Sequence, residues 1–95
     1  MFYELDCRYD SRKSFYGKAH INVRKYDNFI ALVLYSYDTE VASIEEYNNG
    51  MIKYYYNGSY SQTTTRHQKE FFKQNGLSDK EIKELFKNGE LIKIV

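Results

Sequence analysis

The first half of the chain alternates between hydrophobic and polar positions with the two-residue period of β-strands. Segment 20–26 shows this best, because Ile21 and Val23 fall on one face and polar residues on the other. Segment 29–37 is apolar almost throughout, which is typical of a central strand covered on both faces. The Asn-Asn-Gly sequence at 48–50 is a strong hairpin signal. We predict strands over residues 2–8, 20–26, 29–37, 40–47 and 51–57.

After residue 60 the hydrophobic period becomes that of an α-helix, and the first helix is predicted over about 62–75. Ser61 is a suitable N-cap for it, because its hydroxyl can accept a bond from an amide of the first turn. Gly76 fits the left-handed position that follows the helix. In that frame Leu77 meets Phe72, the hydrophobic contact that accompanies a Schellman ending.

The second helix begins at Ser78, and Glu81 three residues later completes a capping box. Asn88-Gly89 ends this helix, and segment 90–95 is short and apolar enough to rejoin a sheet edge. Strands followed by helices predict an α+β fold. We expect an antiparallel sheet of about four to six strands with two C-terminal helices packed on one face. The 95 residues argue for a single domain over 1–95.

Composition narrows the class of protein. Hydrophobic residues make up 42% of the chain and charged residues 28%, the balance of an ordinary globular domain. Eleven tyrosines favour a sheet with an aromatic face, and an aromatic binding platform is the alternative. A net charge of +1 gives no overall attraction to nucleic acid or membrane. The single cysteine, the lack of a membrane-length apolar run and the lack of a signal pattern predict a cytosolic protein.

The first helix starts with three threonines, although threonine is a poor residue for a helix interior. Helical spacing puts Thr64, His67 and Phe71 on one face. We interpret the hydroxyls and His67 as groups that satisfy buried polar atoms where the chain leaves the sheet. As an alternative, a helix N-terminus with Arg66 and His67 beside it suits a phosphate or carboxylate.

Catalysis and metal binding have little support in the sequence. A general base needs an oriented partner and a nucleophile, and no motif pairs His67 with either. The spacings of Cys7, His20 and His67 match no metal-ligand pattern. We therefore predict no enzyme, no cofactor and no metal.

Three segments together resemble elements of a known group of proteins. They are KSFYGKA at 13–19, LYSYDTEVASI at 34–44 and YSQTTTRHQKEFFKQNG at 60–76. The chain is similar here to small uncharacterised accessory proteins carried by phages and plasmids of Gram-positive bacteria. The resemblance implies a genetic setting in the bacterial host cytosol. Accessory proteins of this kind often act by occupying a surface of a host defence enzyme, as anti-CRISPR inhibitors do.

The first functional hypothesis is thus stoichiometric binding to a host defence protein or its nucleic-acid complex, with a Cas nuclease as the best candidate. The acidic segment 38–46 could face a nucleic-acid channel as a crude phosphate mimic. No membrane partner is expected. The predicted partner-binding residues are Lys18, Tyr37, Asp38, Thr39, Glu40, Glu45, Glu46, Tyr60, Arg66 and His67.

The alternative is a module that binds single-stranded nucleic acid. Tyr54 and Tyr56 share one face of a strand and could stack on bases. Phosphate contacts would come from the basic residues Arg12, Lys13, Lys18, Arg24 and Lys25. The chain is expected as a monomer or as a homodimer, which would pair through an open edge at 90–95.

Overall fold

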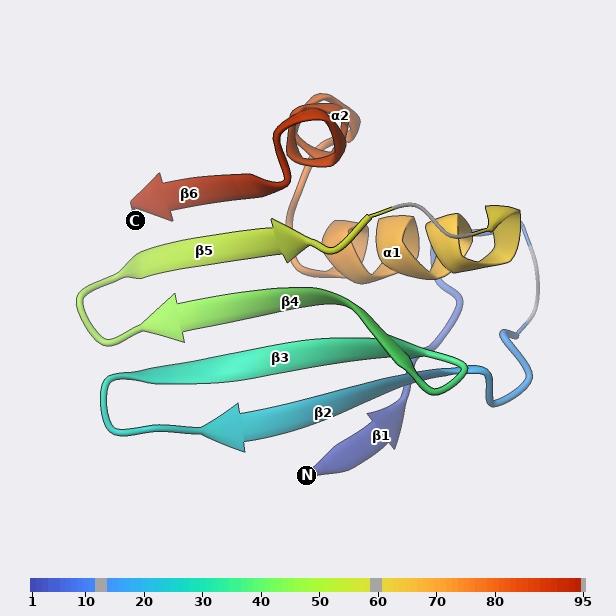
Figure 1. Cartoon of the computed structure of the whole chain (residues 1–95), viewed down its shortest axis with the longest axis horizontal. Helices are drawn as coiled ribbons and strands as arrows, with labels where there is room; N and C mark the ends of the chain where they lie inside the picture. Colours follow the sequence, from blue (N-terminus) through green and yellow to red (C-terminus); the bar gives the residue numbers. More distant parts are fainter. Residues whose placement is uncertain (12–13, 59–60, 95) are drawn as a thin grey trace.

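The computed structural model describes residues 1–11, 14–58 and 61–94, in which a sheet lies against two helices (Figure 1). In chain order the elements are β1 (Phe2–Glu4), β2 (Ala19–Lys25), β3 (Phe29–Ser36), β4 (Thr39–Tyr47), β5 (Met51–Tyr56), α1 (Gln62–Gln74), α2 (Asp79–Asn88) and β6 (Glu90–Ile94). Within the described residues the strands form one six-stranded antiparallel sheet in the order β1-β2-β3-β4-β5-β6. The predicted α+β fold with two C-terminal helices is confirmed.

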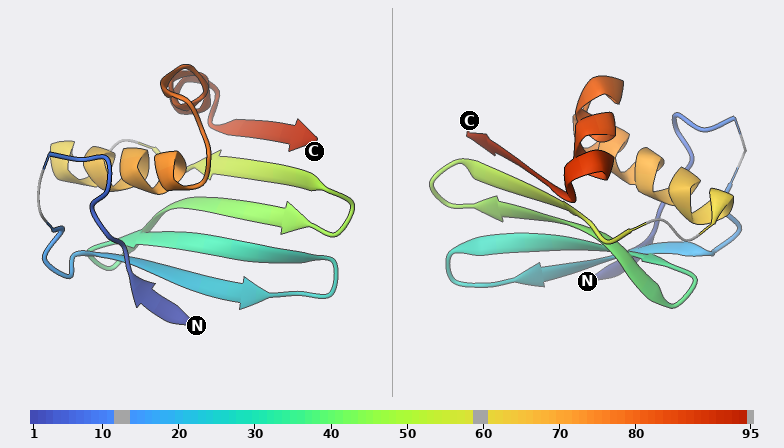
Figure 2. Two further views of the ribbon diagram at one scale, coloured as in Figure 1. Left: turned by 180° about the vertical axis from the view of Figure 1, so that it is seen from behind. Right: turned by 45° about the horizontal axis from the view of Figure 1, so that its top comes forward.

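The core lies between one face of this sheet and α1, which the view from behind shows in front of the strands (Figure 2). The strand registers place Ile21, Leu34 and Ala42 in one row across β2, β3 and β4. All three side chains are buried, and so are Phe71 and Phe72 of α1. Large-to-small changes in a core of this kind cost about 2–5 kcal/mol each.

Both ends of α1 form as the sequence predicts. Ser61 is the N-cap, and its hydroxyl accepts a hydrogen bond from the Thr64 amide at 3.1 Å. After the helix, Gly76 has a φ of 89°. The Leu77 amide then donates to the Phe72 carbonyl at 3.1 Å, which closes the Schellman motif and turns the chain toward α2.

The predicted capping box begins α2 and has a further function. The Ser78 hydroxyl accepts from the Glu81 amide at 3.2 Å, and the Glu81 carboxylate accepts from the Ser78 amide at 2.9 Å. The other oxygen of Glu81 forms an ion pair with Lys93 of β6 at 2.6 Å. The bond from Lys93 is the main cause that lowers the pKa of Glu81. One side chain thus caps α2 and holds the last strand beside it.

The first strand is shorter than predicted, because β1 ends at Glu4 rather than at residue 8. Leu5 turns into the core and is 2% exposed. The amides of Tyr9 and Asp10 then donate to a carboxylate oxygen of Glu70 in α1, at 2.8 and 2.9 Å. These bonds to the helix take the place of continued sheet pairing.

The predicted alternation in the fourth strand fails at Val41. The register between β3 and β4 shifts between Leu34 and Tyr35, so β4 carries an extra residue. Val41 and Ala42 are consecutive, yet both have no exposed surface. The Val41 carbonyl accepts a hydrogen bond from the side-chain amide of Gln68 in α1 at 3.0 Å. This bulge bends the strand toward the helix.

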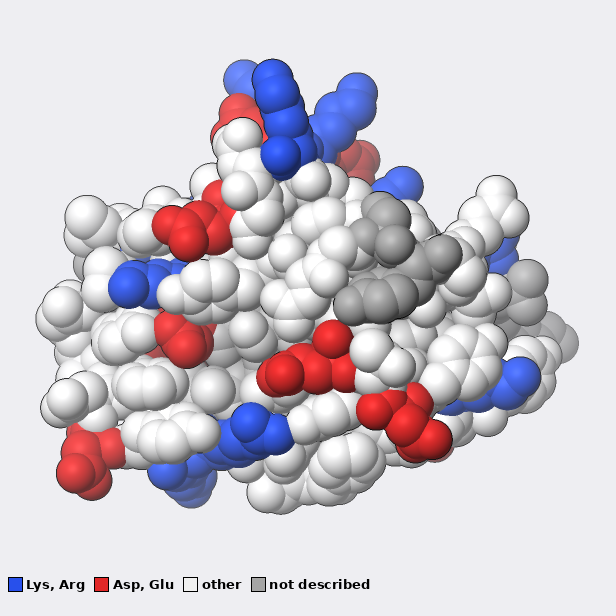
Figure 3. Space-filling view, viewed as in Figure 1, with Lys and Arg blue, Asp and Glu red and all other residues white. Residues whose placement is uncertain are grey.

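The prediction that the third strand is covered on both faces is wrong for the described residues, because no helix lies over the second face of the sheet (Figures 1 and 2). Aromatic side chains cover it locally: Phe2 stacks on His20 with ring centroids 5.2 Å apart, and the Tyr35 hydroxyl accepts from Arg24 at 2.6 Å. Val33, on this same face, is nevertheless only 3% exposed. Figure 3 shows mostly uncharged atoms here, with scattered charges of both signs.

Candidate functional site

Three sequence segments meet at one end of the sheet, and we call this region the motif junction. It consists of the loop at 14–18, the β3–β4 hairpin at 36–39 and the first turns of α1 at 62–67. The Tyr37 amide donates to the Lys18 carbonyl at 2.7 Å, which ties the hairpin to the loop. A cavity of about 120 Å³ opens between them. Its lining residues are Ser14, Phe15, Tyr16, Lys18, Tyr37, Thr63, Arg66 and His67.

The backbone at the junction is held in an unusual conformation. Among the described residues, Tyr16 and Tyr37 are the non-glycine residues with positive φ, at 53° and 58°. A left-handed conformation costs an ordinary residue about 1–2 kcal/mol. Hydrogen bonds maintain it: the Tyr16 amide donates to the Ser14 hydroxyl at 2.9 Å, and the Lys18 amide donates to the Phe15 carbonyl at 3.0 Å. Both tyrosine rings are consequently held at the surface, 72% and 49% exposed.

Beneath these tyrosines, a chain of hydroxyl groups ends on His67. The Ser61 hydroxyl donates to the Thr64 hydroxyl at 3.3 Å. The Ser36 hydroxyl lies 3.0 Å from the Thr64 hydroxyl and 2.8 Å from Nδ1 of His67. A neutral imidazole satisfies this contact in either tautomer, because Nδ1 can accept from the Ser36 hydroxyl or donate to it.

Burial favours the same protonation state. His67 is 1% exposed, and desolvation is the main cause that lowers the pKa of its imidazole. Lys18 lowers this pKa further, while Asp10 opposes the shift. The neutral histidine therefore belongs to the folded structure.

Ser36 and His67 have the spacing of a nucleophile and its base, but their surroundings are those of a structural pair. Ser36 is 2% exposed, and its hydroxyl is shared with Thr64. The ring of Phe15 packs edge-on against the imidazole with centroids 4.6 Å apart. Among the described residues no carboxylate accepts a hydrogen bond from His67, so the orienting group of a catalytic triad has no counterpart here.

The structure brings four of the predicted partner-binding residues together at the junction. Lys18, Tyr37, Arg66 and His67 all line its cavity, and the Lys18 ammonium lies 5.6 Å from the centre of the Tyr37 ring. His67 lies beneath this surface and not on it. Tyr60 lies outside the described residues.

The remaining predicted residues lie along β4 and its hairpin. Asp38, Thr39 and Glu40 are exposed at or beside the hairpin turn. Glu45 and Glu46 point to opposite faces of the sheet, because they are consecutive residues of one strand. Glu45 also accepts a hydrogen bond from the neighbouring Tyr47 hydroxyl at 2.6 Å, which raises the pKa of that tyrosine to about 12. The acidic segment is therefore divided between surfaces.

Sequence reasoning missed two buried polar residues that position the neighbouring segments, Gln68 and Glu70, and it gave no partner for Ser36. The Gln68 side-chain amide donates to the carbonyls of Val41 and Gly58, both at 3.0 Å. Helical spacing from Thr64 contained a signal for Gln68, which lies four residues later on the same face. The partners of Ser36 and Glu70 are distant in sequence, and no local pattern indicates them.

The described residues were also compared with what a metal site and a membrane-spanning helix require. Within the described ranges, no group of three His, Cys, Asp or Glu side chains is arranged to hold a metal ion. Neither of the described helices has the length and apolar character that crossing a membrane requires.

Comparison with known proteins gives a family but no activity. No curated protein and no solved structure matches the chain. A family model described as a family of unknown function, DUF8033, matches residues 3–88, which include all three segments of the motif junction. The chain belongs to this family of unknown function.

Proposed function

We propose that the chain acts by stoichiometric binding to another protein, and that the motif junction is its contact surface. The observation that carries the proposal is the pair of exposed tyrosines on left-handed backbone, Tyr16 and Tyr37. Tyrosine is one of the residue types that dominate the energetics of protein interfaces. Backbone strain of this kind concentrates at functional sites, because the rest of the fold must maintain it.

The chemistry around these rings suits a protein partner. Lys18 and Arg66 supply cations at the cavity, while Asp38 and Glu40 supply carboxylates at the adjoining hairpin. Such a mixture gives directional charge pairing with a folded partner. The buried His67 network keeps the platform rigid, which reduces the entropy lost on binding.

The partner that we propose is a host defence protein in the bacterial cytosol, with a Cas nuclease as the first candidate. This step rests on the resemblance of the three junction segments to accessory proteins of phages and plasmids. In that setting, binding at the junction would block the nuclease without any chemical reaction, so the chain would not act as an enzyme.

Binding to single-stranded nucleic acid is less favoured, because the proposed stacking tyrosines face the helices. Tyr54 is 3% exposed, and Tyr56 stacks on Phe86 of α2 with centroids 4.2 Å apart. A mobility-shift assay with labelled oligonucleotides at low and high salt tests this alternative. We expect no salt-sensitive shift.

The main test is a pull-down of candidate Cas nuclease complexes by the tagged chain, followed by a cleavage assay. We expect retention of one complex and inhibition of its cleavage at one-to-one stoichiometry. The variant Tyr16→Asn/Tyr37→Asn should lose both effects and stay folded, because asparagine tolerates left-handed backbone.

The matched control is Tyr26→Asn, which removes a tyrosine of similar exposure (52%) outside the junction. This variant should bind and inhibit like the wild type. Undiminished binding by the double variant would disprove the assignment of the surface. Failure to retain any defence complex would disprove the proposed partner.

A further inference from the structure

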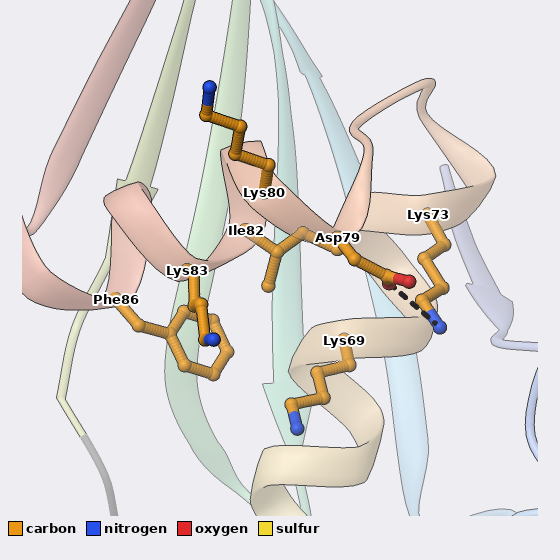
Figure 4. Close-up of a pocket in the computed structure, with 7 residues that line it drawn as sticks. All are labelled: Lys69, Lys73, Asp79, Lys80, Ile82, Lys83 and Phe86. Atoms are coloured by element: carbon orange, nitrogen blue, oxygen red, sulfur yellow. Dashed lines mark ion pairs between the residues drawn. The ribbon is translucent and has the colours of Figure 1, made fainter.

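A second cavity, of about 540 Å³, lies between α1 and α2 and has a strongly basic rim (Figure 4). None of its residues lines the cavity of the motif junction. We call it the lysine groove. It is lined by Lys69, Lys73, Asp79, Lys80, Ile82, Lys83 and Phe86.

The groove combines an apolar floor with cationic walls. Ile82 and Phe86 come from α2, and both pack against the hydrophobic core. Lys69 from α1 and Lys83 from α2 extend toward the same space between the helices (Figure 4). Lys80 points away from that space in the same view.

The charges of the groove are not balanced within the described residues. Asp79 is the one carboxylate among its described lining residues, and it forms an ion pair with Lys73 at 3.2 Å. No ion pair of the described chain reaches Lys69 or Lys83. An anionic ligand between these lysines would relieve their mutual repulsion and gain charge-assisted hydrogen bonds.

The apolar residues at the base of the groove determine which class of anion can bind there. Ile82 is buried, but Phe86 is only partly buried, and a nucleic-acid backbone would satisfy the lysines without an apolar contact to its accessible part. A peptide with a large apolar side chain between carboxylates satisfies both parts of the groove. The volume of about 540 Å³ lies in the usual range for ligand sites and accommodates a few side chains.

We propose that the lysine groove binds an acidic peptide segment of a partner protein, with at least one large apolar side chain on the floor. This site is separate from the proposed contact at the motif junction. It would give the chain a second point of attachment, either to the same partner or to another.

The probe for this proposal is a short fluorescein-labelled peptide in which glutamates flank two leucines, with binding followed by fluorescence anisotropy. We expect saturable binding that weakens with salt. Lys83→Glu should raise the Kd about tenfold, because it replaces an exposed charge attraction by a repulsion. Lys83→Gln should have an intermediate effect.

The matched control is Lys25→Glu, which makes the same charge change at an exposed position of β2 outside the groove. It should leave the Kd unchanged, and thermal melts should show all variants folded. Equal weakening by Lys25→Glu and Lys83→Glu, or absence of binding, would overturn the proposal.

Two further probes distinguish the occupant. A peptide with serine in place of the leucines should bind several-fold more weakly, and equal binding would rule out a function of the apolar floor. A short DNA duplex should compete poorly, and stronger binding by the duplex would identify nucleic acid instead. Peptide binding by the Tyr16→Asn/Tyr37→Asn variant and its loss in Lys83→Glu test the groove without any nuclease, so the two proposals can fail independently.

Discussion

At the scale of single residues, this fold depends on buried polar side chains that form hydrogen bonds to residues distant in sequence. His67 shares a hydrogen bond with Ser36 through Nδ1, and burial favours its neutral form by lowering the pKa of the imidazole. Glu70 is 2% exposed and accepts from two loop amides and from the side chain of Gln74. A buried polar group that loses its partner costs about 1–3 kcal/mol. These positions should therefore be as sensitive to substitution as the apolar core.

The first prediction concerns pH. The unfolded chain protonates His67 at its ordinary pKa of about 6.5, whereas burial lowers the pKa in the folded state. The unfolded state therefore takes up the proton first, so the stabilisation is complete above about pH 6.5 and declines as the pH falls further. We expect Tm to decrease between pH 7 and pH 5. His67→Gln should flatten this decrease and cost about 1–3 kcal/mol at pH 7.

His20→Gln is the control for this measurement, since His20 lies on the sheet face away from α1. It should keep the pH dependence of the wild type. A decrease in Tm that persists in His67→Gln would show that other groups cause it.

The second prediction concerns Glu70. Glu70→Ala leaves the amides of Tyr9 and Asp10 without their acceptor, so we expect a loss of about 2–3 kcal/mol in the free energy of unfolding. Urea denaturation measures it. Glu84→Ala, at an exposed position of α2, should change stability by about 0.5 kcal/mol or less. Similar small effects for both variants would contradict the proposed function of Glu70 in fixing the loop.

At the scale of elements, the helices are defined by their ends. The capping box of α2 also forms the ion pair between Glu81 and Lys93, so the start of a helix and the last strand share one carboxylate. Loss of the Glu81 carboxylate would therefore remove both part of the N-terminal cap of α2 and the ion pair that attaches α2 to β6.

The third prediction tests that cap. Ser78→Ala removes the hydroxyl that accepts from the Glu81 amide, and we expect a loss of about 1 kcal/mol. Differential scanning calorimetry gives the change in Tm. Ser11→Ala, at an exposed loop position, should leave Tm unchanged. If Ser78→Ala leaves Tm unchanged, the ion pair between Glu81 and Lys93 alone fixes α2.

Features of the helices and strands could be predicted from the sequence where the interacting residues lie close together in the chain. Both helices, their caps and the hairpin at 48–50 were predicted correctly, because each depends on residues within a few positions of one another. The bulge at Val41 was missed, since its carbonyl is satisfied by Gln68 from α1. The early end of β1 was missed for the same reason, because its cause is Glu70. Sequence motifs named Lys18, Tyr37 and Arg66 as residues of one site, but only the fold shows that they share a cavity.

At the scale of the whole molecule, the last strand in sequence, β6, completes the sheet. β6 returns after both helices and pairs antiparallel with β5, in a register that sets Leu91 opposite Tyr54. Leu91 packs against the core, and the pairing shields the edge of β5. The C-terminal strand thus completes a layer whose other strands precede the helices in sequence.

The fourth prediction follows from this closure. Truncation after Gly89 removes the β5–β6 ladder and the contacts of Leu91, so we expect a loss of at least about 3 kcal/mol and increased self-association through β5. Thermal melts and light scattering measure both effects. Lys93→Gln, which removes the ion pair alone, should cost about 1 kcal/mol or less and cause no association. A truncated chain as stable as the wild type would show that β6 is dispensable.

The extra residue in β4 has a consequence for how the β3–β4 hairpin is oriented. Successive side chains of a strand point to opposite faces, so the insertion at Val41 sets the phase of every residue between it and the hairpin tip. Loss of a single codon there would turn the hairpin tip over while leaving each of its amino acids in place. The number of residues in β4 therefore sets which way the hairpin tip faces, and under the proposed function a deletion at Val41 would reorient the contact surface without removing either tyrosine.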